Sequence, residues 1–135
     1  MTATQRPLPQ PTDITAAYWQ AAQQEKLLLQ HCQQCQNWQF FPRAFCCHCG
    51  SEDLSWQASA GKGKIYTFTI NRRATHAFFK ERLPYAVAMV ELEEGPCMMA
   101  NIIDSDLSRI AIGAKVQVCF ERASDEITLP QFRLV

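Results

Sequence analysis

Four cysteines in two C-x2-C pairs constrain this chain of 135 residues more than any other feature. Cys32 and Cys35 form the first pair, and Cys46 and Cys49 form the second after ten intervening residues. Each pair places two sulfurs at a tight turn, so two facing turns can supply the four thiolates of a tetrahedral zinc ion. Four protein ligands leave no position open for a substrate. The spacing therefore predicts a structural zinc site, with no catalytic residue among its ligands.

Other thiols and imidazoles lie close to this quartet in the sequence. His31 and His48 flank ligand cysteines, but with four thiols available we expect both to be surface residues. Cys47 is a spare thiol that could compete for metal or oxidise. Cys97 and Cys119 lie in expected strands and are interpreted as small core residues. A rubredoxin binds iron with similar knuckles, so zinc against iron stays open at this point.

Composition indicates a globular chain of one domain or two small modules sharing a core, since 47% of residues are hydrophobic and 19% are charged. No apolar run is long enough to span a membrane, and the N-terminus shows no signal peptide. Seven cysteines without an export signal fit the reducing cytoplasm, where we expect the chain to be located. The net charge of zero is uneven: residues 61–90 hold six basic and one acidic side chain, a net of +5.

Hydrophobic periodicity divides the chain into three parts. The range 1–25 is expected to hold a flexible, proline-containing tail and a helix capped by Thr12 or Asp13, ending near Gln24. The apolar face of this helix is expected to comprise Ile14, Ala17, Tyr18, Ala21 and Ala22. The range 26–59 is expected to form a zinc ribbon, with a hairpin of residues 26–31 and 38–42 around the first knuckle.

The range 60–135 is expected to form a five-stranded barrel. The predicted strands are residues 65–70, 85–92, 97–103, 115–122 and 128–134. Alternation in the first strand predicts that Tyr66, Phe68 and Ile70 share one face. Five short strands with a longer connection between the third and fourth favour a Greek-key barrel of the OB type. The fold class is therefore mainly β, with an N-terminal helix, a rubredoxin-like zinc ribbon and a C-terminal OB-fold.

This layout resembles the family catalogued as domain of unknown function 35, now described as acyl-CoA-associated. The segments that carry the resemblance are LQHCQQC at 29–35, FPR at 41–43, CCHCGS at 46–51, GKGKIYTFT at 61–69, PYAVAMVEL at 84–92, IGAKV at 112–116 and LPQF at 129–132. Two positions depart from the family pattern: Gln36 replaces the usual glycine after the first knuckle, and Cys47 replaces the usual proline in the second.

The resemblance implies a non-catalytic accessory subunit. Such proteins associate with thiolase-like enzymes, namely acyltransferases, hydroxymethylglutaryl-CoA synthases, and acyl-CoA aldolases or hydratases, and are thought to bind or position acyl-CoA. We therefore expect a hetero-oligomer with a thiolase-fold partner, acyl-CoA or CoA as a possible ligand, and no catalysis by the isolated chain.

The basic segment between the first two barrel strands is the candidate ligand site. CoA carries a 3′-phosphate and a pyrophosphate, which lysine and arginine recognise. Candidate contacts are Arg72, Arg73, Lys80 and Arg82, and ordinary surface charge is the alternative. Phe78 and Phe79 in the same loop are candidates for an acyl or partner contact, or for a helical turn that folds back on the barrel.

Two other functions stay open. Zinc ribbons and OB-folds also bind single-stranded nucleic acid, and the basic segment with Tyr66 and Phe68 keeps that alternative. The sequence pI of about 6.8 argues against it, because nucleic-acid-binding domains are usually strongly basic. An iron-containing electron carrier is the second alternative.

Overall fold

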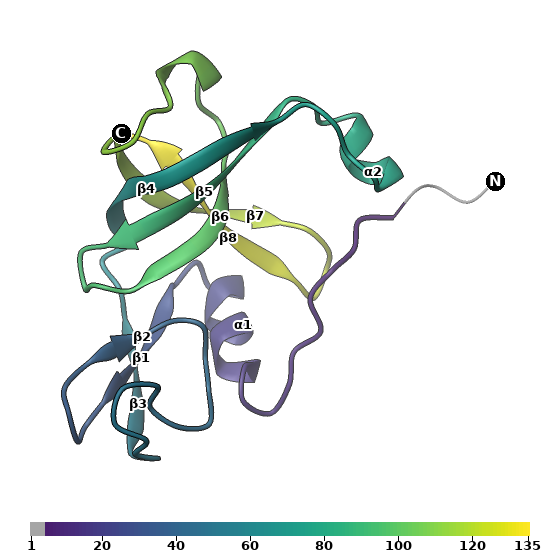
Figure 1. The fold of residues 1–135 in the computed structure, drawn as a ribbon. Helices are drawn as coiled ribbons and strands as arrows, with labels where there is room; N and C mark the ends of the chain where they lie inside the picture. Colours follow the sequence, from purple (N-terminus) through teal and green to yellow (C-terminus); the bar gives the residue numbers. More distant parts are fainter. Residues whose placement is uncertain (1–4) are drawn as a thin grey trace.

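The computed structural model describes residues 5–135 and has three parts, a short helix, a small three-stranded sheet and a closed five-stranded barrel (Figure 1). The predicted fold class is confirmed, because a mainly β chain carries one N-terminal helix, a ribbon and a barrel. Residues 1–4 of the expected tail lie outside the described residues. No helix among the described residues is long and apolar enough to cross a membrane.

The elements follow the chain in a simple order. The helices are α1 (Ala16–Gln23), α2 (Ala77–Lys80) and the 3-10 turn η1 (Leu107–Arg109). The ribbon strands are β1 (Leu28–Cys32), β2 (Trp38–Gln39) and β3 (Leu54–Ala58). The barrel strands are β4 (Lys62–Asn71), β5 (Tyr85–Leu92), β6 (Cys97–Ile102), β7 (Lys115–Arg122) and β8 (Thr128–Leu134).

The ribbon sheet has the order β2-β1-β3, with both pairs antiparallel. The predicted hairpin between residues 26–31 and 38–42 is present as β1 and β2, which pair at Gln30–Gln39 and His31–Trp38. The segment expected only to lead out of the ribbon forms β3, which pairs along the whole of β1. The chain therefore leaves the second knuckle as a third strand that fixes the first.

The barrel closes in the order β4-β5-β6-β8-β7, and β7 pairs back with β4. Four of the five contacts are antiparallel, and β6 with β8 is the parallel one. This is the expected order of an OB-fold, with η1 in the longer connection between the third and fourth barrel strands. The core lies inside the barrel, where Ile65, Val90 and Phe132 are fully buried.

The faces of β4 differ from the prediction. The register of β4 against β5 shifts between Ile65 and Thr67, which marks a β-bulge. Ile65 is therefore buried, whereas Phe68 and Ile70 pack partly buried against the core. Tyr66 falls in the bulge and is 61% exposed, so the prediction that it shares a face with Phe68 and Ile70 is wrong. One extra residue breaks the alternation on which that prediction depended.

Helix α1 begins later than predicted. The N-cap position is Thr15, and its side chain bonds no N–H group of the helix. Thr12 caps the turn before it, because its hydroxyl accepts the Thr15 N–H at 3.2 Å and its own N–H donates to the Thr15 hydroxyl at 2.9 Å. The hydroxyls of Thr12 and Thr15 lie 3.2 Å apart and bond each other in the preceding turn. Ile14 consequently precedes the helix and is 43% exposed, so its assignment to the apolar face was wrong. Tyr18 and Ala22 are buried as predicted.

The ribbon and the barrel are joined both by a common core and by polar contacts. Tyr18 of α1 and Leu27 and Leu29 of the ribbon belong to the same buried cluster as the barrel side chains. At the junction, the Glu94 carboxylate in the β5–β6 turn accepts bonds from the Ser59 hydroxyl and the Ala60 N–H, both at 2.9 Å. The two modules therefore pack as one body.

Candidate metal centre and basic loop

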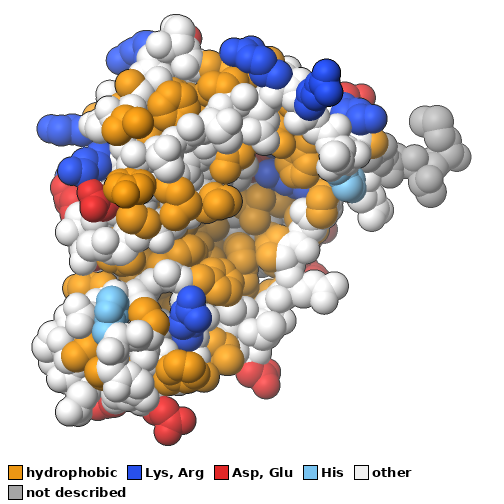
Figure 2. Space-filling model, viewed as in Figure 1, with side chains coloured by type: hydrophobic (Ala, Val, Ile, Leu, Met, Phe, Trp, Pro, Cys, Tyr) orange, Lys and Arg blue, Asp and Glu red, His pale blue; other side chains and the backbone are white. Residues whose placement is uncertain are grey.

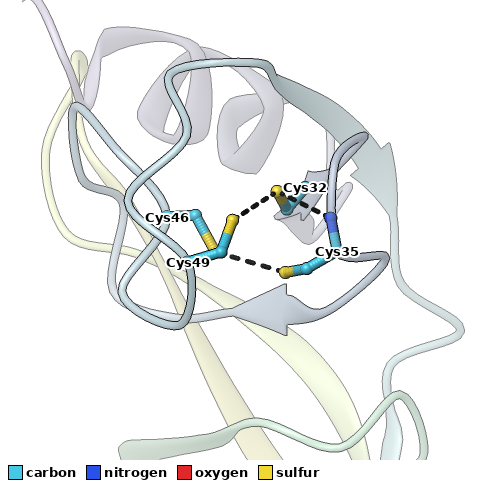
Figure 3. A group of neighbouring side chains, drawn as sticks. All are labelled: Cys32, Cys35, Cys46 and Cys49. Carbon is cyan, nitrogen blue, oxygen red and sulfur yellow. Dashed lines mark hydrogen bonds between the residues drawn. The ribbon is translucent and has the colours of Figure 1, made fainter.

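The four predicted ligand cysteines converge between two turns of the ribbon (Figure 3). Their sulfur atoms all lie within 4.8 Å of one another, with Cys32–Cys49 and Cys35–Cys46 Sγ–Sγ distances of 3.6 Å. Four sulfurs at about 2.3 Å from a tetrahedral zinc ion stand about 3.8 Å apart. The quartet therefore fits zinc, and no fifth metal-binding side chain joins the cluster among the described residues.

Backbone N–H groups and one side-chain amide point at the sulfurs. The Cys35 N–H lies 3.4 Å from Cys32 Sγ, and the His48 N–H lies 3.3 Å from Cys46 Sγ. The Asn37 side-chain amide donates to Cys35 Sγ at 3.2 Å. Such donors stabilise thiolates and hold each ligand in place, as outer-shell contacts do in metal sites. The quartet is thus built for charged sulfur rather than for neutral thiols.

The thiols of the quartet differ in acidity. Hydrogen bonds from the Asn37 side chain and backbone hold the pKa of Cys35 at about 6. The Ser51 N–H lowers the pKa of Cys49, but partial burial of the sulfur and the neighbouring sulfurs outweigh it and raise that pKa to about 12. One thiol is therefore ready to ionise at neutral pH, while another gives up its proton only when a metal replaces it.

Two buried glutamines support the second knuckle, and the sequence analysis missed them. Gln30 and Gln39 are 5% and 4% exposed, and Gln39 Nε2 donates to Gln30 Oε1 at 2.7 Å. Gln30 bonds the N–H and C=O of Arg43, while Gln39 accepts from the Cys47 N–H and donates to the Phe45 carbonyl. The signal was available, because a glutamine in the apolar run KLLLQH pairs in register with one in WQFF.

Both knuckles end in a left-handed residue. Gly50 has φ +81° after the second knuckle, and its N–H bonds the Cys46 carbonyl. Gln36 has φ +63° at the matching position of the first, and its N–H bonds the Cys32 carbonyl. Glycine adopts this conformation readily, whereas a side chain there costs about 1 kcal/mol. Gln36, which stands where the family usually has glycine, therefore preserves the turn of the first knuckle but lowers its stability.

The remaining thiols and histidines stand outside the quartet. His31 makes an edge-to-face contact with Trp38, with ring centroids 4.7 Å apart, and Cys47 is exposed. Cys97 and Cys119 are half-buried rather than fully buried core residues, and burial raises the pKa of both thiols. A raised thiol pKa disfavours the thiolate and hence a nucleophilic role.

The predicted basic residues lie along the connection between β4 and β5. Arg72 and Arg73 follow the end of β4 and are exposed, and Lys80 is the exposed last residue of α2. Arg82 is engaged within the protein, because its guanidinium pairs with Glu121 Oε2 at 3.0 Å. All four candidates are therefore exposed, and Arg82 differs from the others because it is also paired with the barrel.

The two candidate phenylalanines form one helical turn, and both lie close to the Arg6 guanidinium, which is 5.4 Å from the Phe78 ring centroid and 5.8 Å from that of Phe79. The Arg82 guanidinium lies 5.0 Å from the Phe78 centroid. Phe79 also packs against Tyr85 of the barrel at 5.8 Å. The helical turn that folds back on the barrel, one of the two alternatives from the sequence, is therefore present.

Arg6 was not expected to have a role, because it falls in the range predicted to be a flexible tail. Its side chain is 9% exposed and pairs with Glu121 Oε1 at 3.1 Å. Burial alone would raise the pKa of Glu121, but hydrogen bonds from Arg6, Arg82 and Gln131 outweigh that effect and lower it. A contact across 115 positions has no local signal in the sequence.

An apolar groove, here called the aromatic groove, runs between the ribbon, α1, α2 and the barrel. Its volume is about 500 Å³, and no Asp, Glu, Lys or Arg lines it. Apolar side chains gather in a hollow between the lower ribbon part and the upper barrel part of the molecule (Figure 2). The main lining side chains are Tyr18, Trp19, Phe40, Phe41, Phe79 and Met99. Of its lining residues, the sequence predicted only Phe79 as a candidate contact, because the walls come from four separate segments.

Known proteins share both modules. Residues 19–55 match the family described as the ChsH2 rubredoxin-like zinc ribbon domain, and residues 56–121 match the ChsH2 C-terminal OB-fold domain. A probable enoyl-CoA hydratase alpha subunit of Thermomonospora curvata is 35% identical over 95% of this chain. The chain spans 40% of the length of that relative.

A DUF35 domain-containing scaffold protein of Methanothermobacter thermautotrophicus is 33% identical over 85% of this chain and 86% of its own length. Among solved structures, a chain of the Ltp2-ChsH2(DUF35) aldolase matches with a TM-score of 0.84 at 34% identity, covering 94% of this chain and 98% of that one. A DUF35 protein of unknown function from Sulfolobus solfataricus, at 12% identity and a TM-score of 0.64, shares the fold. The chain therefore belongs to the DUF35 family, with a ChsH2-type rubredoxin-like zinc ribbon followed by an OB-fold domain.

Proposed function

We propose that this protein is a non-catalytic accessory subunit of an enzyme that acts on acyl-CoA, of the thiolase-like acyltransferase, synthase, aldolase or hydratase type. The observation that carries the proposal is the aromatic groove, an open apolar surface that no Asp, Glu, Lys or Arg lines, on a chain whose metal site is closed. An apolar hollow of this kind is typical of a surface that another molecule covers. A site with four sulfur ligands offers no coordination position for chemistry.

The names of the relatives agree with that role. One relative is an alpha subunit of a probable enoyl-CoA hydratase, others are scaffold proteins, and the matching structure is an aldolase assembly of Ltp2 with ChsH2(DUF35). Each name describes a component that works with another chain. The proposal extends this arrangement to the present protein, as a hetero-oligomer in the reducing cytoplasm.

The basic loop is proposed to contact the CoA phosphates. Arg72, Arg73 and Lys80 are exposed on one connection between adjacent strands, which is where OB-folds commonly bind ligands. Arg82 would have to exchange Glu121 for a phosphate, so we assign it the smallest share of binding. Phe79 lines the aromatic groove and is the proposed apolar contact, whereas Phe78 does not line it and lies near two guanidinium groups.

Affinity purification of the tagged chain from its native host tests the accessory role. We expect an acyl-CoA enzyme to co-purify at a fixed stoichiometry, identified by mass spectrometry, and the isolated chain to show no turnover of an acyl-CoA. Turnover by the isolated chain at enzyme-like rates would contradict the proposal. Recovery of the chain without any acyl-CoA enzyme would contradict it as well.

Binding of CoA is tested separately by isothermal titration of the chain, alone and with its partner, with CoA and with dephospho-CoA. The variant Arg72→Ala with Arg73→Ala is expected to weaken binding of CoA about 10-fold or more, since each charged hydrogen bond contributes about 1.5–3 kcal/mol. Arg122→Ala is the matched control, because Arg122 is an exposed arginine at the end of another strand. Equal affinities of the two variants would refute the phosphate assignment.

The two other functions have direct tests. Binding of single-stranded nucleic acid needs exposed aromatic side chains for base stacking, and the bulge leaves Tyr66 exposed but Phe68 packed against the core. Fluorescence polarisation with a mixed oligonucleotide at low salt is expected to show no binding. An iron electron carrier would be coloured when purified, and we expect a colourless protein with one zinc ion.

A further inference from the structure

The aromatic groove carries a feature beyond its apolar lining, an unpaired strand edge. Strand β6 pairs with β5 along its whole length, but within residues 5–135 it pairs with β8 only at Ile102–Phe132. The β6 residues Met98, Met99 and Ala100 line the groove, with Leu129 and Pro130 of β8 on the other side. An open edge of this kind is a template for pairing with another chain.

Residue Pro130 explains why the parallel ladder stops. Continued from Ile102–Phe132, the register would place Pro130 opposite Ala100, and a proline has no N–H to donate to β6. The Gln131 side chain replaces the next β8 backbone contact, because its Oε1 accepts the Asn101 N–H at 2.8 Å. The strands therefore separate beyond one paired position, and the gap between them belongs to the groove.

The direction of the β6 peptide groups follows from alternation along a strand. The N–H groups of Asn101 and Ile103 both point toward β8, since they bond Gln131 Oε1 and the Phe132 carbonyl. The N–H and C=O of Met99, two residues earlier, point the same way and so face the groove. Asn101 and Gln131 are by contrast already hydrogen-bonded to their neighbours.

Two protruding side chains and a basic rim describe what fits the groove. Phe41 is 44% exposed and Met99 is 65% exposed, so both stand out as anchors rather than as the recessed walls of a small-molecule pocket. Arg43 follows Phe41 by two residues and Lys80 follows Phe79 directly; both are exposed, and neither takes part in an ion pair within residues 5–135. These two cations, one on the ribbon and one on α2, complement an acidic flank.

We propose that the partner enzyme inserts an extended apolar segment with acidic flanks into the aromatic groove, and that this segment pairs with the Met99 peptide of β6. The inference rests on the proposed accessory function and identifies the surface that performs it. Strand addition provides main-chain hydrogen bonds, and the aromatic walls and Met99 provide apolar contact. The acidic flanks of the segment then meet Arg43 and Lys80.

The test uses the acyl-CoA enzyme recovered from the native host, purified and titrated against variants of the full chain. Met99→Asp is expected to weaken binding at least about 30-fold, the loss typical of a central anchor. Ile112→Asp is the matched control and is expected to bind as the wild type does, because Ile112 is 71% exposed and does not line the groove. An unchanged circular dichroism spectrum and thermal unfolding midpoint would show that the barrel of both variants is folded.

Residue-resolved hydrogen exchange tests the strand pairing itself. The Met99 amide is expected to exchange at least 10-fold more slowly in the complex than in the free chain. If the enzyme binds Met99→Asp as tightly as Ile112→Asp, the groove assignment is wrong while the accessory function stands. Weakened binding with unchanged exchange at Met99 would overturn the pairing. A homodimer of the isolated chain that Met99→Asp dissociates would assign the groove to a second copy and overturn the proposal.

Discussion

The ribbon and the barrel hold their shapes by different means. The barrel surrounds apolar side chains, among them Ile65, Val90 and Phe132, which are fully buried. The ribbon places two glutamines and four cysteines where a core would stand, and its three strands are at most five residues long. A sheet this small cannot bury enough apolar surface to fold alone, so a metal and a polar network take the place of a core.

The difference teaches where each module is vulnerable. Apolar packing is insensitive to pH and chelators, whereas thiolate coordination depends on both. Because Tyr18, Leu27 and Leu29 link the ribbon to the barrel core, damage to one module can also reach the other. Perturbing each module separately measures how independent they are.

Loss of a metal ligand is expected to have the largest effect. Cys32→Ser removes a buried sulfur and should reduce bound zinc to well below one ion per chain, since structural zinc contributes apparent free energies of about 10–16 kcal/mol in small domains. Amide NMR spectra should lose the ribbon signals and keep those of the barrel. Cys47→Ser is the control and should retain full zinc content; loss of zinc there would make Cys47 a ligand.

Acid should separate the two modules in the wild type. Protons compete with zinc for the thiolates, so zinc affinity falls progressively as the pH decreases, and most steeply below about 6, where Cys35 is also protonated without metal. The pKa of Glu121 is lower in the folded protein than in the unfolded chain, so ionised Glu121 stabilises the fold at a pH above the unfolded-state pKa. That stabilisation is lost as the pH falls through the lower, folded-state pKa. A chelator assay during a pH titration should therefore record zinc release before the barrel spectrum changes. Simultaneous loss of both would contradict this order.

A cavity in the barrel core perturbs the other module and leaves the zinc ligands in place. Phe132→Ala empties a fully buried site and should lower the free energy of unfolding by about 3–5 kcal/mol. Denaturant unfolding followed by far-ultraviolet circular dichroism, which the barrel strands dominate, measures the loss, and Phe45→Ala, at a 53% exposed position, should cost little. We expect Phe132→Ala to keep one zinc ion per chain at neutral pH. Release of zinc from the folded variant would show that the ribbon depends on the barrel core.

The buried glutamine pair should contribute less to stability than either a metal ligand or the barrel core. Gln39→Ala removes two contacts to the second knuckle and leaves buried polar groups unpaired, at a cost of about 1–3 kcal/mol. The expected result is faster zinc transfer to a chelator at unchanged stoichiometry. Gln57→Ala provides the comparison, because Gln57 is exposed on β3. Identical transfer rates for the two variants would remove the supporting role of Gln39.

The smallest expected effect is a gain. Gln36→Gly should stabilise the ribbon by about 1 kcal/mol, because glycine adopts the φ of +63° without the penalty of a side chain. Gln34→Gly at a neighbouring exposed position without positive φ should not stabilise it. Zinc affinity from competition with a chelator is the measurement, and a loss at Gln36→Gly would mean that its side-chain bond to the Gln33 carbonyl matters more.

Local patterns predicted the elements, and contacts between distant segments limited the prediction. Ligand spacing and alternation identified the cysteine quartet and all five barrel strands. The bulge at Tyr66 was not predicted, because an extra residue in β4 becomes apparent only when β4 is paired with β5. The role of Arg6 and the groove were not predicted for the same reason. Arg6 pairs with the distant Glu121, and Met99 lies far along the chain from the ribbon residues with which it lines the groove.

The bonds from Ser59 and Ala60 to Glu94 make the β5–β6 turn a mechanical link. The same hairpin carries Met99 at its exposed edge, so the ribbon is attached to the strand that borders the groove. A segment seated on β6 would stiffen the hairpin and, through Glu94, the segment that connects the ribbon to the barrel. Occupation of the groove would thereby reduce the mobility of the two C-x2-C turns without changing the metal coordination.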